Sequence, residues 1–366
     1  MTAAFLLHGL IAGSFAGRIP ALQEGLALSA GELGVALLMV ALGCITTMQF
    51  GALLAHRVGE RVVLAVGLVG WAALLPLAAL APSLVTLCVL LFLVGVASGN
   101  ADVAMNALGV HVERRLGRSV MAGLHGFWSI GGVLGAGVAA LAAHAGLAAQ
   151  QQFAGVALVV VLLVAWCWRG WADPSTAAEA PPAFTWPSGP VLLIGSVAFA
   201  AVFAEIASHD WSAVFLRDVT GASAGTAALG VVAVAGAMAF GRLTGDAVVR
   251  RFGVVATVRT GGFIAFAGVV LLLATTLPWA AIAGFGLIGL GLSTVVPLAF
   301  AAAGRIGGVH PGHQIAAVAT IGYGAGMATP FLVGVIAQLS SLQVAFGVVG
   351  ALVLVVVVLA PRLRVP

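Results

Sequence analysis

Residues 342–360, LQVAFGVVGALVLVVVVLA, contain no charged side chain. The β-branched part of this run, Val353 to Val358, would favour a strand in water. A helix that crosses a membrane needs about 20 apolar residues, and this run has that length. Because an unpaired strand cannot satisfy its backbone groups in lipid, the run is predicted to be a transmembrane helix.

The whole chain shares this apolar character. Of its 366 residues, 62% are hydrophobic and 7% are charged, and the mean hydropathy is +1.19. Soluble proteins carry about 25% charged residues. A chain this apolar cannot cover a water-facing surface, which excludes a soluble enzyme, a nucleic-acid-binding protein and a disordered protein. The composition therefore predicts an integral membrane protein.

Apolar runs predict twelve membrane spans joined by short loops. The runs lie at 3–23, 31–55, 62–81, 84–111, 120–144, 148–168, 190–216, 223–249, 254–277, 279–303, 312–338 and 342–360. The proline-containing polar stretch 169–189 reads as a cytoplasmic linker between residues 1–168 and residues 190–366. The predicted fold class is an all-α membrane protein, with twelve transmembrane helices in two six-helix pseudo-symmetric bundles.

Arginine predicts the orientation of these spans, since all 15 basic residues are arginine. With the N-terminus in the cytoplasm, every arginine but Arg18, Arg217 and Arg242 falls in or beside a cytoplasmic loop, as the positive-inside rule requires. Both termini are then cytoplasmic, and the expected location is the bacterial inner membrane. The first run lacks a basic lead, so it is not read as a signal peptide, and the true start is expected upstream.

No metal or cofactor is expected. Cys44, Cys88 and Cys167 lie in apolar runs and read as small buried side chains. His310 and His313 have ligand-like spacing, but no cysteine or acid lies nearby. Residues 284–289, GFGLIG, match a dinucleotide pattern without the strand that this motif needs, so their glycines are expected to allow close helix packing.

A short repeat links the two halves. Arg57-Val58-Gly59 follows the second run, and Arg251-Phe252-Gly253 follows the eighth, 194 residues later. The same offset maps the fifth run onto the eleventh. Two halves in the same register are typical of transporters with parallel repeats.

Ordered motifs along the chain resemble those of the major facilitator superfamily, and within it the fucose-permease-like branch. The motifs are Arg18 to Gln23, Ala52 to Arg61, Gly99 to Asn106, Leu124 to Gly132, Asp210 to Ser212 and Gly241 to Asp246. The resemblance implies a non-enzymatic transporter with a central cavity that opens alternately to either side. It also implies gate or structural roles for His56, Arg57 and Arg251.

The chain departs from the family pattern at two places. His56 stands where the loop signature usually has an acid. Sugar-type members often have an acid in the middle of the first span, where this chain has Ala16 and Gly17. A relay of two acids therefore cannot be carried over directly.

Asp102 is the leading candidate for proton coupling. An ionisable side chain within an apolar span is costly and commonly functional. Asn106 lies four residues further on, hence on the same helix face. The alternative is a structural carboxylate capped by Asn100, Asn106 or an arginine.

Glu205 is the second candidate for coupling, with His209 as a substrate-binding residue. Glu205, Ser208, His209 and Ser212 share one helix face by their spacing. The alternative for Glu205 is a salt bridge, for example to Arg18. Arg242 and Asp246, four residues apart on one predicted helix, are expected to form a structural gate pair.

His125, Trp128 and Gly132 form one face of the fifth span. The resemblance places this face on the central cavity, where an indole could stack on a sugar ring. The alternative is that Trp128 packs between helices. Asn106, Gln49, Tyr323 and Arg18 are further candidates for substrate binding.

The predicted function is secondary active transport of a small polar solute, such as a sugar, coupled to protons. The first alternative is an efflux antiporter of drugs or metabolites. The fifth span lacks the Gly-Pro pair that such antiporters often carry, which counts against export. The second alternative is a non-transporting sensor or scaffold. The expected partners are the solute, protons and membrane lipid, without nucleic acid, and the chain is expected to be a monomer.

Overall fold

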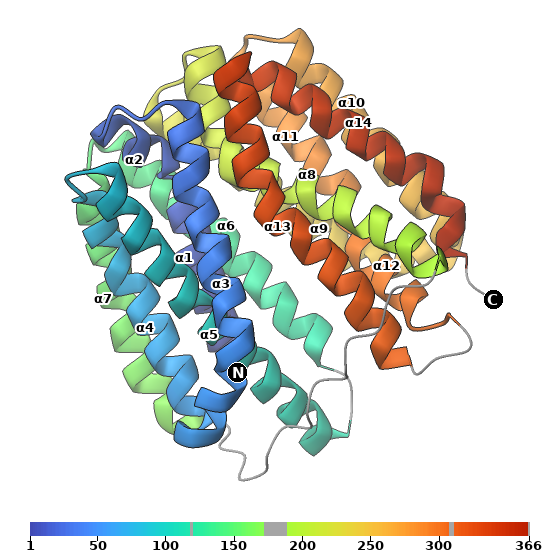
Figure 1. Ribbon diagram of the computed structural model, residues 1–366, viewed down its shortest axis with the longest axis horizontal. Coiled ribbons are helices and arrows are strands. Elements are labelled where there is room, and N and C mark those ends of the chain that lie inside the picture. The colour runs from blue at the N-terminus through green and yellow to red at the C-terminus, as the bar shows by residue number, and fades with distance from the viewer. Residues whose placement is uncertain (118–119, 172–188, 307–310, 365–366) are drawn as a thin grey trace. The chain divides into compact units, whose positions relative to one another are not determined.

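The computed structural model describes residues 1–117, 120–171, 189–306 and 311–364. For residues 48–53, 56, 122, 311–313, 315 and 316 it describes the backbone alone. Across the described residues the chain is helical and contains no strand (Figure 1).

The first half of the chain forms seven of the α-helices within the described ranges. They are α1 (Thr2–Ala16), α2 (Ile19–Gly25), α3 (Ala30–Val58), α4 (Glu60–Ala79), α5 (Leu84–Leu116), α6 (Met121–His144) and α7 (Ala149–Cys167), followed by the short helix η1 (Trp168–Gly170).

The second half forms the remaining helices of the described chain. They are α8 (Gly189–Thr220), α9 (Ala224–Phe252), α10 (Val254–Ala274), α11 (Pro278–Leu292), α12 (Val295–Ala303), α13 (Pro311–Leu339) and α14 (Leu342–Leu359), followed by η2 (Ala360–Leu363).

The predicted fold class is confirmed. Within the described residues, 11 helical stretches are long and apolar enough to cross a membrane, and the bent pair of α1 and α2 raises the number to 12. The β-branched run near the C-terminus is the helix α14, as the lipid argument predicts.

Two of the predicted spans are broken, and a proline explains each break. The first span bends by 43° between α1 and α2, and Pro20 lies at the start of α2. The tenth span is interrupted at Ser293 and Thr294, just before Pro297. A proline has no N–H to donate to the carbonyl four residues earlier, and its ring clashes there. Those carbonyls belong to Ala16 and Ser293, at the two breaks.

Helix contacts divide the chain into two compact units. Unit 1 contains Met1–Glu179 and Ser223–Val232, and unit 2 contains Ala180–Ala222 and Ala233–Pro366. The predicted boundaries at 168 and 190 remain a prediction.

Corresponding helices pair in the same way inside each unit. In unit 1, α1 packs on α6, and α4 packs on both α5 and α7. In unit 2, α8 packs on α13, and α10 packs on both α11 and α14. The repeat suggested by the two arginine–glycine motifs therefore extends to the packing of whole helices.

The same two motifs end in glycines with matching backbone angles. Gly59 joins α3 to α4 with φ 88°, and Gly253 joins α9 to α10 with φ 80°. Side chains other than glycine rarely adopt this left-handed region, so glycine allows each helix to end and the next to begin at once.

Close glycine contacts hold α1 against α6 in unit 1. A Cβ on Gly9 or Gly13 would overlap the backbone at Trp128 or Gly132 of α6. A Cβ on Gly135 would overlap the Leu10 carbonyl of α1. The two backbones therefore lie in direct contact, as small residues permit in membrane helices.

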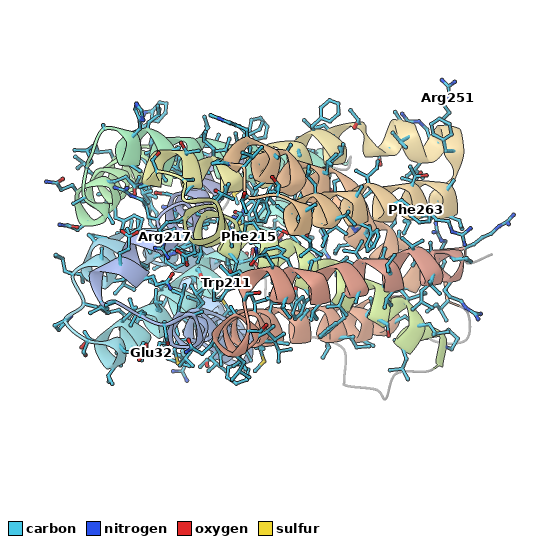
Figure 2. All side chains as sticks on the ribbon, turned by 90° about the horizontal axis from the view of Figure 1, so that it is seen from above. Glu32, Trp211, Phe215, Arg217, Arg251 and Phe263 are labelled. Atoms are coloured by element: carbon cyan, nitrogen blue, oxygen red, sulfur yellow. The ribbon has the colours of Figure 1, made fainter. Side chains whose placement is uncertain are left out.

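Three phenylalanines form an aromatic core in unit 2. Phe215 of α8, Phe285 of α11 and Phe346 of α14 are fully buried and meet edge to face, with ring centroids 5.3–5.6 Å apart. Figure 2 labels Phe215 and the buried Trp211 on the same helix. This geometry is the preferred one for aromatic pairs and fixes three helices of the unit together.

Candidate functional site

Asp102 and Asn106 form a polar pair on α5. The Asn106 Nδ2 atom donates to the Asp102 carbonyl oxygen at 2.9 Å and to its Oδ1 atom at 3.2 Å. Both side chains are half-buried. Within the described part of the chain, no cationic side chain forms an ion pair with Asp102. The side-chain partner of this carboxylate is therefore a neutral amide.

Trp128 is held by His8, a residue that the sequence analysis did not single out. The Trp128 Nε1 atom donates to the Nδ1 atom of His8 at 2.9 Å. His8 lies buried on α1, and the edge of Trp71 from α4 meets its ring at a centroid distance of 4.8 Å. Three helices of unit 1 thus meet around one imidazole.

His8 uses one of its two ring nitrogens in the hydrogen bond with Trp128. Its other ring nitrogen, Nε2, is buried. His125 is exposed, and its ring meets the edge of Phe5 at 5.2 Å. Unit 1 therefore brings His8, Trp71 and Trp128 into one cluster, and Asp102 and Asn106 form a separate pair on α5.

A signal for His8 was present in the sequence. It is an ionisable residue inside the first apolar run, the same feature that identified Asp102. Its partner Trp128 lies 120 residues away, so only the packing of α1 on α6 brings the two rings together.

Glu205 is paired with Arg242 in unit 2. The Arg242 Nη2 atom on α9 donates to Glu205 Oε1 on α8 at 3.0 Å, and about a quarter of each side chain is exposed (26% and 23%). The spacing on α9 had suggested Asp246 as the partner of Arg242, but Asp246 is exposed. A carboxylate in a less polar interior attracts a guanidinium more strongly than one facing solvent does.

His209 pairs with its neighbour on α8. Its Nδ1 atom lies 3.0 Å from Asp210 Oδ1. Ser208 and Ser212 are completely buried, and their hydroxyl oxygens have no hydrogen-bond partner among the described residues. On the helix face predicted from spacing, Ser208 and Ser212 are therefore buried, whereas Glu205 and His209 are half-buried.

Arg18 lies at the break between α1 and α2. Its side chain is buried, and its Nη2 atom donates to the carbonyl oxygen of Leu147 in the α6–α7 loop. The structure thus gives Arg18 a backbone partner in unit 1 rather than Glu205.

The other predicted site residues lie on α3, α9 and α13. Tyr323 on α13 is 53% exposed. Arg57 is exposed at the end of α3, and Arg251 extends outward at the end of α9, over the ring of Phe252 (Figure 2). Gln49 and His56 lie on α3, but their side chains are outside the described residues.

The chain matches known transporters over its full length. The family model of the Major Facilitator Superfamily matches residues 1–216. An uncharacterised transporter of Sinorhizobium fredii, y4wD, is 35% identical and covers 100% of this chain and 97% of its own length. An uncharacterised MFS-type transporter of Yersinia pestis is 36% identical over 96% of this chain and 92% of its own length.

The fold comparison agrees with the sequence comparison. A crystal structure of the nucleoside transporter NupG aligns with a TM-score of 0.76 and covers 99% of this chain and 98% of its own, at 11% identity. At this identity the likeness shows the fold alone. The family model and the two relatives show that the chain belongs to the major facilitator superfamily, as a multi-pass membrane transporter of small solutes and not an enzyme.

Proposed function

We propose that the chain moves a small polar solute, such as a sugar, by alternating access and that protons drive this movement through Asp102. The observation that carries the proposal is the half-buried Asp102 on α5, whose side-chain partner is the neutral amide of Asn106. A carboxylate without an ion pair can be neutral in one state of a transport cycle and charged in another.

Trp128 is the proposed contact for the ring of the solute. Because its N–H is bonded to His8, the indole can offer a solute its ring face but not its donor. The apolar face of a sugar ring or a flat base could stack there. Asn106 and the exposed His125 lie in the same unit and supply polar groups.

Nucleosides join sugars as solutes to be tested. The solved neighbour NupG is named a nucleoside transporter, and a nucleoside combines a sugar ring with a flat base. The likeness in fold is a reason to include nucleosides among the solutes tested, but it does not favour them over sugars.

The proposed setting is the bacterial inner membrane, with both termini and the linker 169–189 in the cytoplasm and the chain acting as a monomer. The arginine distribution supports this orientation, since 12 of the 15 arginines then lie at the cytoplasmic side.

The test uses purified protein in proteoliposomes with an imposed pH gradient and a panel of sugars and nucleosides. Wild-type protein should accumulate its solute against a concentration gradient. Asp102→Asn keeps the size and hydrogen bonding of the side chain but removes its charge, so it should bind and exchange the solute without accumulating it. Reversing the pH gradient distinguishes import from the efflux alternative.

Asp218→Asn is the matched control. Asp218 is an exposed acid at the end of α8 that pairs with Arg217, so its replacement should leave accumulation unchanged. Accumulation at the wild-type level by Asp102→Asn would show that Asp102 does not couple transport to protons.

A further inference from the structure

Three arginines converge on a pocket at one end of unit 2. A cavity of about 740 Å³ is lined by Arg259 of α10, Arg305 after α12 and Arg364 after η2. All three side chains are exposed. Within the described residues, none of the three has an acidic partner. Three cations held together without an acid make a site for an anion.

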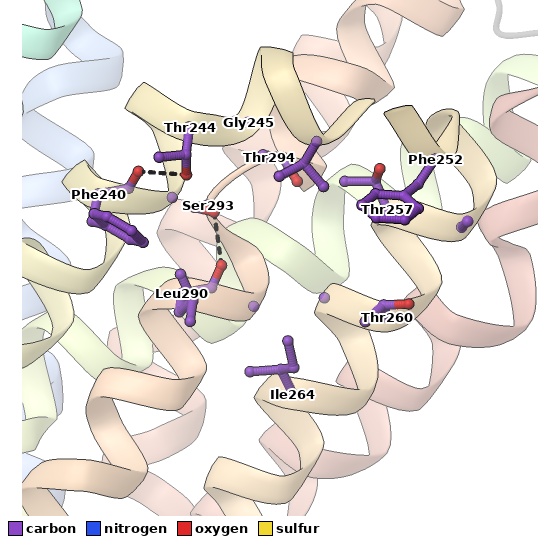
Figure 3. Close-up of a pocket in the computed structure, with 15 residues that line it drawn as sticks. Phe240, Thr244, Gly245, Phe252, Thr257, Thr260, Ile264, Leu290, Ser293 and Thr294 are labelled. Carbon is purple, nitrogen blue, oxygen red and sulfur yellow. Dashed lines mark hydrogen bonds between the residues drawn. The ribbon is translucent and has the colours of Figure 1, made fainter. Parts of the chain in front are cut away.

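A second, apolar cavity lies beside this basic pocket. It has a volume of about 380 Å³ and lies between α9, α10 and α11, where Ile264 and Leu290 are among the lining side chains (Figure 3). Phe252, Ala256 and Thr260 line both cavities, so the basic and apolar spaces adjoin.

The hydroxyl groups in the apolar cavity are mostly satisfied by their own helices. Thr244 donates to the Phe240 carbonyl at 2.9 Å, and Ser293 donates to the Leu290 carbonyl at 2.7 Å, both drawn in Figure 3. Thr257 donates to the Gly253 carbonyl at 2.8 Å. Because these three hydroxyl groups already donate to backbone carbonyls, they do not require a polar ligand. The cavity is therefore suited to a hydrocarbon chain.

We propose that these adjoining cavities bind one anionic phospholipid, with its phosphate on Arg259, Arg305 and Arg364 and an acyl chain in the apolar cavity. Charge and shape support a lipid over a soluble anion. A free phosphate would use the arginines alone, whereas a phospholipid also fills the apolar space that adjoins them. Basic pockets at the ends of membrane helices are suited to anionic head groups.

The first test measures lipid binding by native mass spectrometry on detergent-purified protein, titrated with phosphatidylglycerol or phosphatidylcholine. Wild-type protein should bind phosphatidylglycerol more tightly than phosphatidylcholine. The triple variant Arg259→Gln/Arg305→Gln/Arg364→Gln should weaken phosphatidylglycerol binding by about tenfold or more. Equal binding of the two lipids by the wild type, or unchanged phosphatidylglycerol binding by the triple variant, would overturn the proposal.

A charge-matched control separates a site from general attraction. Arg169→Gln/Arg250→Gln/Arg362→Gln removes three exposed arginines that line neither cavity, and Arg362 is two residues from Arg364. This control should retain phosphatidylglycerol binding. An equal loss in both triple variants would show that net charge alone attracts the lipid. Where the test variant does not fold, judged by size-exclusion chromatography, the three single Arg→Gln variants replace it, each expected to weaken binding severalfold.

The final arm distinguishes the lipid from free phosphate. Ala256 lines both cavities, and Ala256→Trp would place a large side chain where they adjoin. This variant should weaken phosphatidylglycerol binding because the indole blocks the acyl chain. Glycerol 3-phosphate carries the phosphate without acyl chains and should bind wild-type protein far more weakly than phosphatidylglycerol does. Equally tight binding of glycerol 3-phosphate would show a soluble-anion site and overturn the assignment to lipid.

Discussion

The two units share a backbone plan but hold their interior acids differently. In unit 1, Asp102 has the amide of Asn106 as its side-chain partner, whereas in unit 2 Glu205 accepts a hydrogen bond from Arg242. Both side chains of the pair in unit 2 are about three-quarters buried, where breaking an ion pair is costly. The repeated architecture therefore holds an acid bonded to an amide in one half and an acid in an ion pair in the other.

The largest expected effect comes from giving Asp102 of unit 1 a cationic partner, as Glu205 has in unit 2. Asn106→Arg places a cation four residues from Asp102 on the same helix face, which favours an ion pair. Because the pair would hold Asp102 in its charged form, proton-driven accumulation should fall by about tenfold or more. The measurement is solute uptake by proteoliposomes under a pH gradient. Asn106→Gln retains an amide as the control. Normal accumulation by Asn106→Arg would contradict the coupling role proposed for Asp102.

The converse change removes the ion pair of unit 2. Glu205→Gln should lower the free energy of unfolding by roughly 1–3 kcal/mol, because Arg242 loses a charged partner in a partly buried place. The double variant Glu205→Gln/Arg242→Gln should recover much of that loss. Thermal unfolding in detergent supplies the comparison, analysed as a double-mutant cycle. Strictly additive losses from the two single variants would mean that the two side chains do not stabilise each other.

The aromatic group of unit 1 should affect solute binding more than folding. Trp128→Ala removes the stacking face, and Trp128→Phe keeps a ring but loses the donor to His8. The hydrogen bond to His8 lies within the protein and is worth about 0.5–1.5 kcal/mol, so Trp128→Phe should lower folding stability by about that amount and keep most of the solute binding. Trp128→Ala also loses the stacking face, so it should weaken solute binding by roughly twofold to tenfold. Binding titration and folded yield are measured together. A collapse of yield with unchanged affinity in the folded fraction would assign Trp128 to packing.

The smallest expected effect concerns a feature that the two units share, the glycine that joins two helices at Gly59 and at Gly253. Gly59→Ala and Gly253→Ala place a Cβ at positive φ, and each should destabilise its helix junction by about 1 kcal/mol. Gly137→Ala is the control, since this glycine lies within α6 with open space around it. Thermal unfolding of the three variants should show similar losses at the two junctions only. A clear loss at one junction alone would show that the repeat does not extend to their energetics.

The positions of the spans could be predicted because lipid imposes a minimum apolar length on every helix. The pairing of Asp102 with Asn106 could be predicted too, since four residues on one helix fix a common face. The contact of Arg242 with Glu205 could not, because it joins two helices and spans 37 residues of sequence. An i, i+4 spacing pointed to Asp246 instead, since spacing on one helix says nothing of an acid on its neighbour. The hydrogen bond between His8 and Trp128 could not be predicted for the same reason, because the two residues lie on different helices.

The glycine contact between α1 and α6 also limits how the transporter can move. Helices whose backbones touch at Gly9, Gly13 and Gly135 cannot slide along or roll over each other without driving carbonyl groups into one another. The two helices are therefore expected to move together as one rigid body. His8 and Trp128 lie on opposite helices of this pair, so the hydrogen bond between them is expected to persist during such a movement. The shape changes of transport are therefore expected at helix contacts other than the one between α1 and α6.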